Sequence, residues 1–327
     1  MKHLIAPDLS GHPAYARVFQ PGSLTLGFIA PLEAYPNTPW PTLDNHADMV
    51  RQVDAAGFAA LWLRDVPFYD PNFGDLGQLV DPMVYAGWIA AQTKSIAIGT
   101  AGIVLPLRDP IAVAKQATSA DLLMNGRFLL GLSTGDRPSE YAAFGSDIDT
   151  RVERYRDAVA IIRSATEAQF PHHASHFYGT FSGNLDLLPK PVGGRLPILA
   201  IGRAGQSIEW LAENTDGWIW HMSDHRRLGL VVQTWRDAGA GMPFKPYGYG
   251  AMFDLAEDPD APHQVLGYYM RIGRNTLIDL LKRQRDEGVN HVALNPKPLK
   301  RPFAEVMDEL ATYVLPHFPT NSPNRAA

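Results

Sequence analysis

Cysteine is absent from this sequence, and so is any excess of basic residues. The first absence excludes disulfide bonds, thiolate metal sites and cysteine nucleophiles. The second argues against a nucleic-acid partner, because the formal net charge is −5 and nucleic-acid-binding proteins usually carry a basic excess. No apolar run approaches the length of a membrane span either. We therefore expect no nucleic-acid partner and no membrane association.

The N-terminal segment MKHLIAPDLSGHPAYARVFQPG lacks the apolar core of a signal peptide, because prolines, glycines and charges interrupt it. Hydrophobic residues make up 46% of the 327 residues, which is enough for a large core. We expect a cytoplasmic protein whose residues 1–327 form a single domain.

A helix, a glycine and an apolar run follow one another four times along the chain, at Gly57, Gly126, Gly217 and Gly288. Glycine is the usual residue just past the end of a helix, since it adopts a left-handed conformation without steric cost. The apolar runs are typical of strands covered on both faces. This repetition predicts alternating helices and parallel strands.

Eight runs of this kind predict strands at Leu24–Ile29, Ala59–Leu63, Ile96–Thr100, Phe128–Leu132, Ile198–Ile201, Trp218–Trp220, Tyr247–Phe253 and His291–Leu294. Eight alternating units predict an α/β fold, a (β/α)8 TIM barrel with insertions. A doubly wound open sheet fits less well, because eight strands leave little chain for a second domain. Irregular segments at about 170–194 and 239–263 are the expected insertions, and the first is compatible with a hairpin.

The residues expected at the carboxyl ends of these strands, where TIM barrels carry out their chemistry, are mostly small or polar. Asp65, beside Arg64, is a candidate catalytic acid or base, although a strand-end ion pair that shapes a loop explains it equally well. His172, His173 and His176 fit a solvated loop better than a metal site. We expect no metal.

The fifth strand ends in a glycine-containing turn that continues into a predicted helix beginning at Ala204. The first amides of a helix have no intrahelical partner and, with the helix dipole, attract anions. Gly205 would let a phosphate approach the backbone, while Arg203 and Ser207 would add a guanidinium and a hydroxyl. An ordinary capped turn is the alternative.

Several segments, taken in order, resemble the bacterial luciferase-like flavin monooxygenase family. They include LTLGFIAPL, MVRQVDAAGFAALWLRD and LLPKPVGGRLPILAIG, and the most specific is the run IAIGTAGIVLPLRDPIAVAKQATSADLLMNGRFLLGLSTGDRPSEYAAFG. The resemblance implies a barrel with insertions, usually oligomeric, that binds FMN or, in some branches, coenzyme F420. It also implies a small-molecule substrate and reduced flavin from a partner reductase. We expect a homodimer.

The resemblance implies roles for particular residues. A non-prolyl cis peptide and bulge are expected at Ala101–Gly102, behind the flavin ring. The expected cofactor-binding residues are Thr100, Ala101, Gly102, Ser133, Thr134, Gly202, Arg203, Ala204, Gly205, Gln206 and Ser207, with the phosphate held from Arg203 to Ser207. Apart from the resemblance, candidate polar groups around the ring are Asp65, Thr100, His221 and Asn295, and His221 is a candidate proton donor or acceptor. A strand-end histidine satisfied by backbone groups is the alternative.

The chain also departs from the luciferases. Ser133 stands at the position of their reactive cysteine, Thr134 at that of a phosphate-binding arginine, and Val66 at that of their catalytic histidine. We therefore expect no light emission from a long-chain aldehyde. The segment Arg64–Asp81 replaces the usual region after the second strand, which implies a different substrate.

The sequence thus predicts an FMN-dependent oxidoreductase, a monooxygenase that uses reduced FMN and oxygen. Two alternatives stay open. One is F420-dependent hydride transfer, for which Arg108, Arg137 and Arg203 could hold the longer anionic tail of that cofactor. The other is a catalytically silent flavin-binding homologue.

Overall fold

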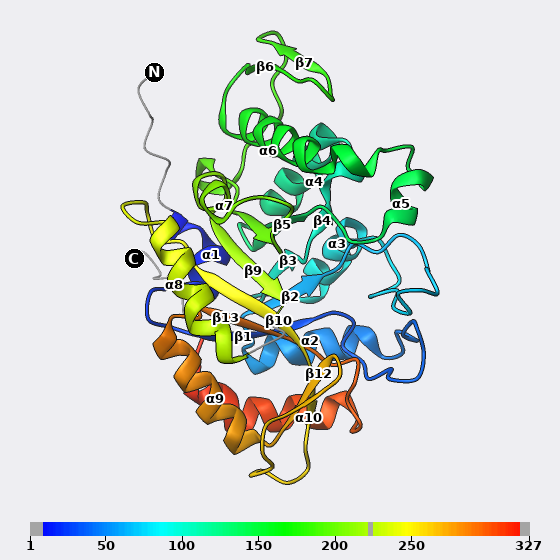
Figure 1. Ribbon diagram of the computed structural model, residues 1–327, viewed down its shortest axis with the longest axis vertical. Coiled ribbons are helices and arrows are strands. Elements are labelled where there is room, and N and C mark those ends of the chain that lie inside the picture. The colour runs from blue at the N-terminus through cyan, green and yellow to red at the C-terminus, as the bar shows by residue number, and fades with distance from the viewer. Residues whose placement is uncertain (1–8, 222–224, 321–327) are drawn as a thin grey trace.

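The computed structural model describes residues 9–221 and 225–320, and Figure 1 shows its course. The first eight residues of the segment inspected for a signal peptide lie outside the described residues. Within the described part, no helix is both long enough and apolar enough to pass through a bilayer.

Parallel strands close into a barrel, and the predicted (β/α)8 fold is confirmed (Figure 1). In order around the barrel they are β1 (Thr25–Ile29), β2 (Ala60–Leu63), β3 (Ala97–Thr100), β5 (Phe128–Ser133), β8 (Ile198–Ile201), β9 (Gly217–His221), β10 (Tyr247–Leu255) and β13 (His291–Asn295). Pairing of β13 with β1 closes the ring. The short strand β4 (Ile103–Val104) pairs with β5. Every predicted strand is present, with ends shifted by at most two residues.

Helices surround the strands, as Figure 1 shows. They are α1 (Pro13–Val18), α2 (His46–Ala56), α3 (Pro82–Gln92), α4 (Pro110–Leu123), α5 (Pro138–Ala143), α6 (Arg151–Glu167), α7 (Ile208–Asn214), α8 (Leu228–Ala238), α9 (Arg274–Glu287) and α10 (Phe303–Glu309). Gly57 and Gly288 are left-handed C-caps, as predicted. The prediction for Gly217 is wrong. This glycine is the first residue of β9. A Cβ atom there would lie 2.8 Å from Pro246 Cγ, so the close approach of Pro246 requires glycine.

The two interruptions of the barrel differ from each other. Strands β6 (His172–Ala174) and β7 (Thr180–Ser182) form an antiparallel hairpin inside the first predicted insertion, and Figure 1 shows it projecting beyond α6. The range 239–263, expected to be an irregular insertion around the predicted strand at 247–253, contains the whole of β10. The additional strands follow it as β11 (Gln264–Leu266) and β12 (Tyr269–Ile272), which pair with each other, and β12 extends the sheet beside β10.

A hydrogen-bonded group fills the interior of the barrel. Trp62 Nε1 donates to His291 Nε2 at 2.8 Å, and His291 Nδ1 lies 2.8 Å from the hydroxyl of Thr25. That hydroxyl donates onward to the Val18 carbonyl, so it accepts from Nδ1 of a neutral ring. Burial lowers the pKa of His291 to about 3. Glycine is required opposite these rings, because a Cβ atom on Gly99 would lie 2.4 Å from Trp62 Cζ3.

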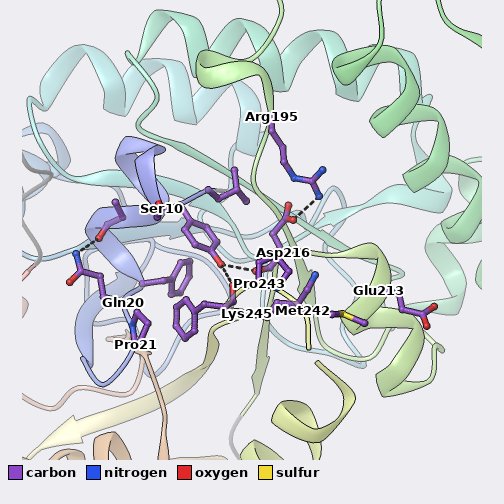
Figure 2. A pocket seen from close by; sticks show the side chains of 14 residues that line it. Ser10, Gln20, Pro21, Arg195, Glu213, Asp216, Met242, Pro243 and Lys245 are labelled. Atoms are coloured by element: carbon purple, nitrogen blue, oxygen red, sulfur yellow. Dashed lines mark hydrogen bonds and ion pairs between the residues drawn. The ribbon is translucent and has the colours of Figure 1, made fainter. Parts of the chain in front are cut away.

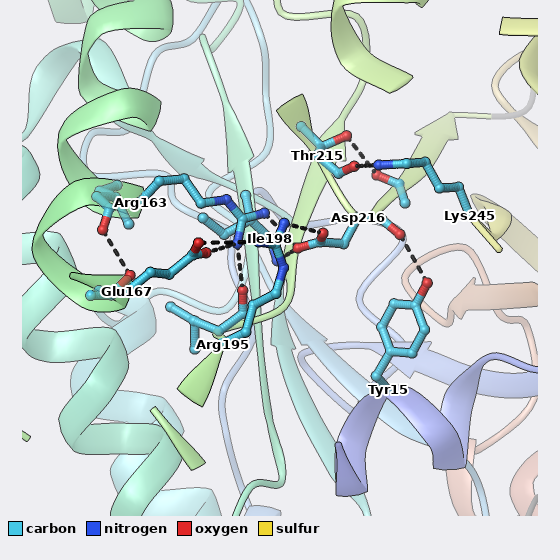
Figure 3. Close-up of polar contacts among 12 residues, drawn as sticks. Tyr15, Arg163, Glu167, Arg195, Ile198, Thr215, Asp216 and Lys245 are labelled. Carbon is cyan, nitrogen blue, oxygen red and sulfur yellow. Dashed lines mark hydrogen bonds and ion pairs between the residues drawn. The ribbon is translucent and has the colours of Figure 1, made fainter. Parts of the chain in front are cut away.

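Charged residues are paired with one another near the amino ends of the strands (Figure 3). The carboxylate of Asp216 accepts from Arg163 at 2.5 Å and from Arg195 at 2.8 Å. Burial alone would raise the pKa of Asp216, but the two guanidinium groups lower it to about 2. The Tyr15 hydroxyl donates to the Asp216 carbonyl at 3.0 Å, which ties α1 to the end of the barrel.

Replacing His291 with glutamine should reduce the pH dependence of stability. Protonation of His291 favours the unfolded chain, where its pKa is about 6.5, because the folded pKa is about 3. The neutral ring therefore contributes fully to the free energy of unfolding above pH 6.5. This contribution falls by about 1.4 kcal/mol per pH unit as the pH drops from the unfolded pKa towards the folded pKa. Glutamine keeps a donor and an acceptor for Thr25 and Trp62 but does not titrate.

Urea unfolding at several pH values between 7.5 and 5 measures this effect. The unfolding free energy of His291→Gln should fall less steeply with decreasing pH than that of the wild-type protein. The exposed His176→Gln variant is the control and should follow the wild type. Equal slopes for all three proteins would contradict the assignment of His291 as a neutral buried ring.

Candidate functional site

A cavity of about 420 Å³ opens at the carboxyl ends of the barrel strands. It brings together most of the residues that the sequence predicts for the site, namely Asp65, Ala101, Gly102, Ser133, Thr134, Gly202, Arg203, Ala204 and His221. Its other lining residues are Arg64, Val66, Val104, Gly135, Asp136, Arg137, Glu140, Ile201 and Trp220. Within the described residues, no group of three or more histidine and carboxylate side chains could hold a metal ion.

One wall of the cavity is backbone that follows β3. The Ala101–Gly102 peptide bond is cis and not prolyl, as the resemblance implies. The Ser133 hydroxyl donates to the carbonyls of Gly102 at 3.2 Å and Ile103 at 3.4 Å, so this side chain holds the wall in place. A Cβ atom on Gly102 would lie 2.7 Å from Ile201 Cγ1, which explains the need for glycine there.

Asp65 lines the cavity, but its carboxylate is already engaged. Arg108 donates to Oδ2 at 2.8 Å and to Oδ1 at 2.6 Å, and the Val104 amide donates to Oδ2 at 3.0 Å. This bidentate pair fixes the segment after β3 against the end of β2. The geometry gives Asp65 a positioning role, and a direct catalytic role stays a prediction.

Two of the predicted polar groups do not line the cavity. Thr100 is fully buried, and its hydroxyl donates to the Gly131 carbonyl at 2.7 Å and accepts from the Gly131 amide at 2.9 Å. This side chain therefore stands behind the wall and joins β3 to β5. The Asn295 side chain accepts from the Lys297 amide at 3.0 Å and is also buried, so it stabilises the turn after β13.

The turn after β8 presents backbone and one guanidinium to the cavity. Gly202, Ala204 and Gly205 all have positive φ, at 68°, 48° and 68°. Left-handed residues are common in the concave amide arrangements that bind anions, and they are unusual for a residue with a side chain, such as Ala204. Arg203 is exposed, with one hydrogen bond of 3.3 Å to the Gln206 carbonyl.

The rest of this turn packs against the protein. Helix α7 begins at Ile208, not at Ala204 as predicted, because Ser207 is its N-cap and accepts from the Trp210 amide at 3.1 Å. The buried Gln206 amide donates to the Val152 carbonyl at 3.1 Å. A Cβ atom on Gly205 would lie 2.6 Å from Val152 Cγ2, so contact with α6 requires this glycine. None of these three residues lines the cavity.

His221 lies at the mouth of the cavity, at the end of β9. Partial burial lowers the pKa of its imidazole, and a hydrogen bond with the Gly250 backbone opposes that shift. The neighbouring Trp220 lines the cavity and stacks on Trp218 at a centroid distance of 5.2 Å. Trp218 Nε1 donates to the Gly202 carbonyl at 2.8 Å, which couples β9 to the turn after β8.

Glu140 is a lining residue that the sequence reasoning missed. Its side chain is 4% exposed, and Oε1 lies 3.7 Å from a guanidinium nitrogen of Arg137, beyond hydrogen-bond distance. Burial raises the pKa of Glu140, Arg137 lowers it, and Asp65 and Asp136 raise it, with a net increase. The i, i+3 spacing of Arg137 and Glu140 at a helix start was the available signal.

A larger cavity of about 650 Å³ lies at the amino end of the barrel (Figure 2). Figure 2 shows Arg195 and Asp216 pointing at each other there, as part of the charge network already described. The Tyr15 hydroxyl, which bonds the Asp216 carbonyl, also donates to the Phe244 carbonyl at 3.0 Å. These polar groups stabilise the fold, and we therefore place the functional site at the carboxyl end.

Comparison with known proteins finds a family model, described as luciferase-like monooxygenase, that matches residues 22–310. The alkanal monooxygenase alpha chain of Photorhabdus luminescens is 26% identical over 167 residues, which are 49% of this chain and 43% of that protein. The 4-hydroxyprotoasukamycin monooxygenase of Streptomyces nodosus subsp. asukaensis is 27% identical over 172 residues, or 52% and 45%. The chain thus spans less than half the length of these two relatives.

Solved structures show the same fold. Monooxygenase RslO1 from Streptomyces bottropensis superposes with a TM-score of 0.74 at 19% identity, covering 90% of this chain and 99% of that one. An F420-dependent secondary alcohol dehydrogenase with an F420-acetone adduct gives 0.72 at 17% identity, with coverage of 90% and 98%. The FMN-bound oxygenating constituent of 3,6-diketocamphane monooxygenase from Pseudomonas putida gives 0.70 at 15%, with the same coverage.

Asp65→Asn should destabilise the protein strongly. The amide cannot neutralise Arg108, so the substitution leaves this partly buried guanidinium with the more exposed Asp81 as its remaining carboxylate partner, and the loss of the charged hydrogen bonds to Asp65 should cost about 1.5–3 kcal/mol. Asp48→Asn is the matched control, because Asp48 pairs with Arg51 on the surface of α2 and should contribute less than about 0.5 kcal/mol. Denaturant unfolding measures both. Equal losses in the two variants would contradict the positioning role of Asp65.

Proposed function

This chain belongs to the luciferase-like monooxygenase family, and on that premise we propose that it binds FMN in the carboxyl-end cavity and, with reduced FMN and oxygen, oxygenates a small organic substrate. The observation that carries the proposal is the meeting of two features in one cavity. One is the backbone wall at Ala101–Gly102, and the other is the turn of Gly202, Arg203 and Ala204, with its exposed guanidinium.

The residues present fit FMN. A volume of about 420 Å³ lies in the usual range of ligand cavities. The turn at Gly202–Ala204 would hold the phosphate, with Arg203 as the charged donor, and the wall at Ala101–Gly102 would lie against the ring. The bound reduced flavin would supply the electrons that activate oxygen.

The residues of the chain would position the flavin and the substrate, exclude water from the cavity and move a proton. Val66, Val104, Ile201 and Trp220 supply apolar lining that limits the entry of water. His221 has one ring nitrogen engaged with the Gly250 backbone, and burial lowers the pKa of the imidazole, so the other nitrogen is able to accept a proton and return it.

The arginines favour FMN over F420 as the cofactor. Arg108 is paired with Asp65 at 2.6 Å and with Asp81 at 3.1 Å. Arg137 donates to the Asp75 carbonyl at 2.8 Å. Arg137 and Arg203 both line the cavity, but Arg203 has the fewer internal contacts among the described residues, and one guanidinium suits a single phosphate. F420-dependent hydride transfer remains the second candidate, supported by the fold of the F420-dependent dehydrogenase.

A catalytically silent flavin-binding homologue is the third candidate. Oxygen-dependent oxidation of an organic compound by the protein with reduced FMN would eliminate it. A partner reductase, a homodimer and a cytoplasmic location stay predictions.

Arg203→Ala should weaken FMN binding while leaving riboflavin binding almost unchanged. A charged hydrogen bond contributes roughly 1.5–3 kcal/mol, so the Kd for FMN should rise about 10- to 100-fold. Riboflavin has no phosphate and should not respond. Quenching of flavin fluorescence on titration with protein measures both affinities. Ser207→Ala should cost less than Arg203→Ala, because the Ser207 side chain caps α7 and does not line the cavity.

Arg285→Ala, on the outer surface of α9, is the matched control and should leave both affinities unchanged. A loss of FMN and riboflavin affinity by the same factor in Arg203→Ala would mean general damage to the turn. No loss in either affinity would place the phosphate elsewhere.

His221→Gln should slow the oxygen-dependent reoxidation of bound reduced FMN and flatten its pH profile. Proton transfer by a positioned side chain typically contributes about 100-fold or more. Stopped-flow absorbance of the flavin between pH 5 and 8 measures the rate, and an FMN titration of the same variant controls for binding. A wild-type rate and pH profile in a variant that binds FMN normally would discard the proton-transfer role.

A further inference from the structure

Three exposed phenylalanine side chains gather on one side of the carboxyl end of the barrel. Phe68, Phe73 and Phe144, here named the aromatic entrance, are 47%, 41% and 45% exposed. Phe68 belongs to the segment after β2, while Phe144 follows α5, and their ring centroids are 5.7 Å apart in an edge arrangement. Single exposed apolar residues are ordinary, but exposed rings in contact with each other call for an occupant.

The aromatic entrance is continuous with the cavity. Arg137 lines the cavity, and its guanidinium carbon lies 5.0 Å from the centroid of the Phe73 ring. The same guanidinium donates to the Phe68 carbonyl at 3.5 Å. Val66, two residues before Phe68, also lines the cavity. The rings therefore border the opening through which a substrate would reach the site.

The segment that carries Phe68 and Phe73 is fixed to the barrel. The carboxylate of Asp75 pairs with Arg64 at 2.6 Å, at the end of β2, and with Lys297 at 3.1 Å, just after β13. Burial opposes ionisation, but Arg64 and then Lys297 hold the pKa of Asp75 well below its usual range, so the pairs persist near neutral pH. The entrance is thus preorganised and loses little freedom on binding.

We propose that the aromatic entrance binds an uncharged aromatic or alicyclic ring of the substrate and so determines specificity, an inference that rests on the proposed function. Phenylalanine rings offer large apolar contact areas with few rotatable bonds, and they pack edge or face against other rings. The guanidinium of Arg137 already faces Phe73 and backbone carbonyls, so the entrance offers little to an anionic group. The ring would lie at the opening while the reacting part of the substrate enters the cavity.

Binding of prodan, a neutral naphthyl ketone whose emission shifts to shorter wavelength in apolar surroundings, tests this inference on the full chain with and without FMN. Wild-type protein should bind prodan, and Phe68→Ser and Phe144→Ser should each raise its Kd about three- to tenfold. Phe68→Trp, which keeps an aromatic ring at this position, should bind prodan about as well as the wild-type protein does. FMN affinity should be unchanged in every variant, since these residues do not line the cavity.

Leu123→Ser is the matched control, because Leu123 is 82% exposed at the end of α4. The inference is overturned if wild-type protein does not bind prodan, or if the entrance variants bind it as Leu123→Ser does. It is also overturned if size-exclusion chromatography shows a dimer that Phe68→Ser and Phe144→Ser abolish and Leu123→Ser retains, since a second copy would then cover the rings. Failure of wild-type protein to bind FMN would instead refute the proposed function, whatever the prodan result.

Discussion

The contact between Trp62 and His291 in the barrel interior is the constraint on which the rest of the structure depends. The two rings come from β2 and β13, on either side of β1, and their hydrogen bond of 2.8 Å spans that strand. The strand registers leave room for them, since Trp62 lies opposite Gly99 of β3 and His291 opposite Gly248 of β10. A Cβ atom on Gly99 would collide with the Trp62 ring, and a Cβ atom on Gly248 would lie 2.9 Å from the His291 carbonyl oxygen, so a shift of one strand past another is costly.

Fixing that register also fixes where each strand ends, and the candidate site is made of strand ends. Asp65 follows β2 three residues after Trp62, and Ala101–Gly102 follows β3 two residues after Gly99. The Asp65–Arg108 pair then joins these two ends, while Ser133 at the end of β5 holds the cis wall from the other side. The cavity is a consequence of barrel geometry and of a few charge-assisted contacts at one rim.

Charged side chains are paired with one another at the amino end of the barrel and are less completely paired at the carboxyl end. The first arrangement stabilises the fold, and the second leaves groups for a ligand. At the amino end, Asp216 is matched by two arginines, and its neighbour Tyr15 is bonded to backbone carbonyls (Figure 3). At the carboxyl end, Arg203 lines the cavity and its guanidinium makes one hydrogen bond to the described residues, while Glu140 lies beyond hydrogen-bond distance of Arg137. Groups left without full internal pairing in a cavity are the ones available to a ligand.

The sequence by itself determined the barrel, because apolar runs and C-cap glycines such as Gly57 are local signals of strands and helix ends. It also placed the turn after β8 and, through a family resemblance, the cis peptide at Ala101–Gly102. Only the tertiary structure decided which side chains face the cavity. Asp65 pairs with Arg108, 43 residues away, and the Thr100 hydroxyl bonds the Gly131 carbonyl. Gly205, predicted to bind phosphate, instead packs against Val152 of α6. Such contacts join segments far apart in the chain, and no local pattern records which of the possible partners the closed barrel brings within reach.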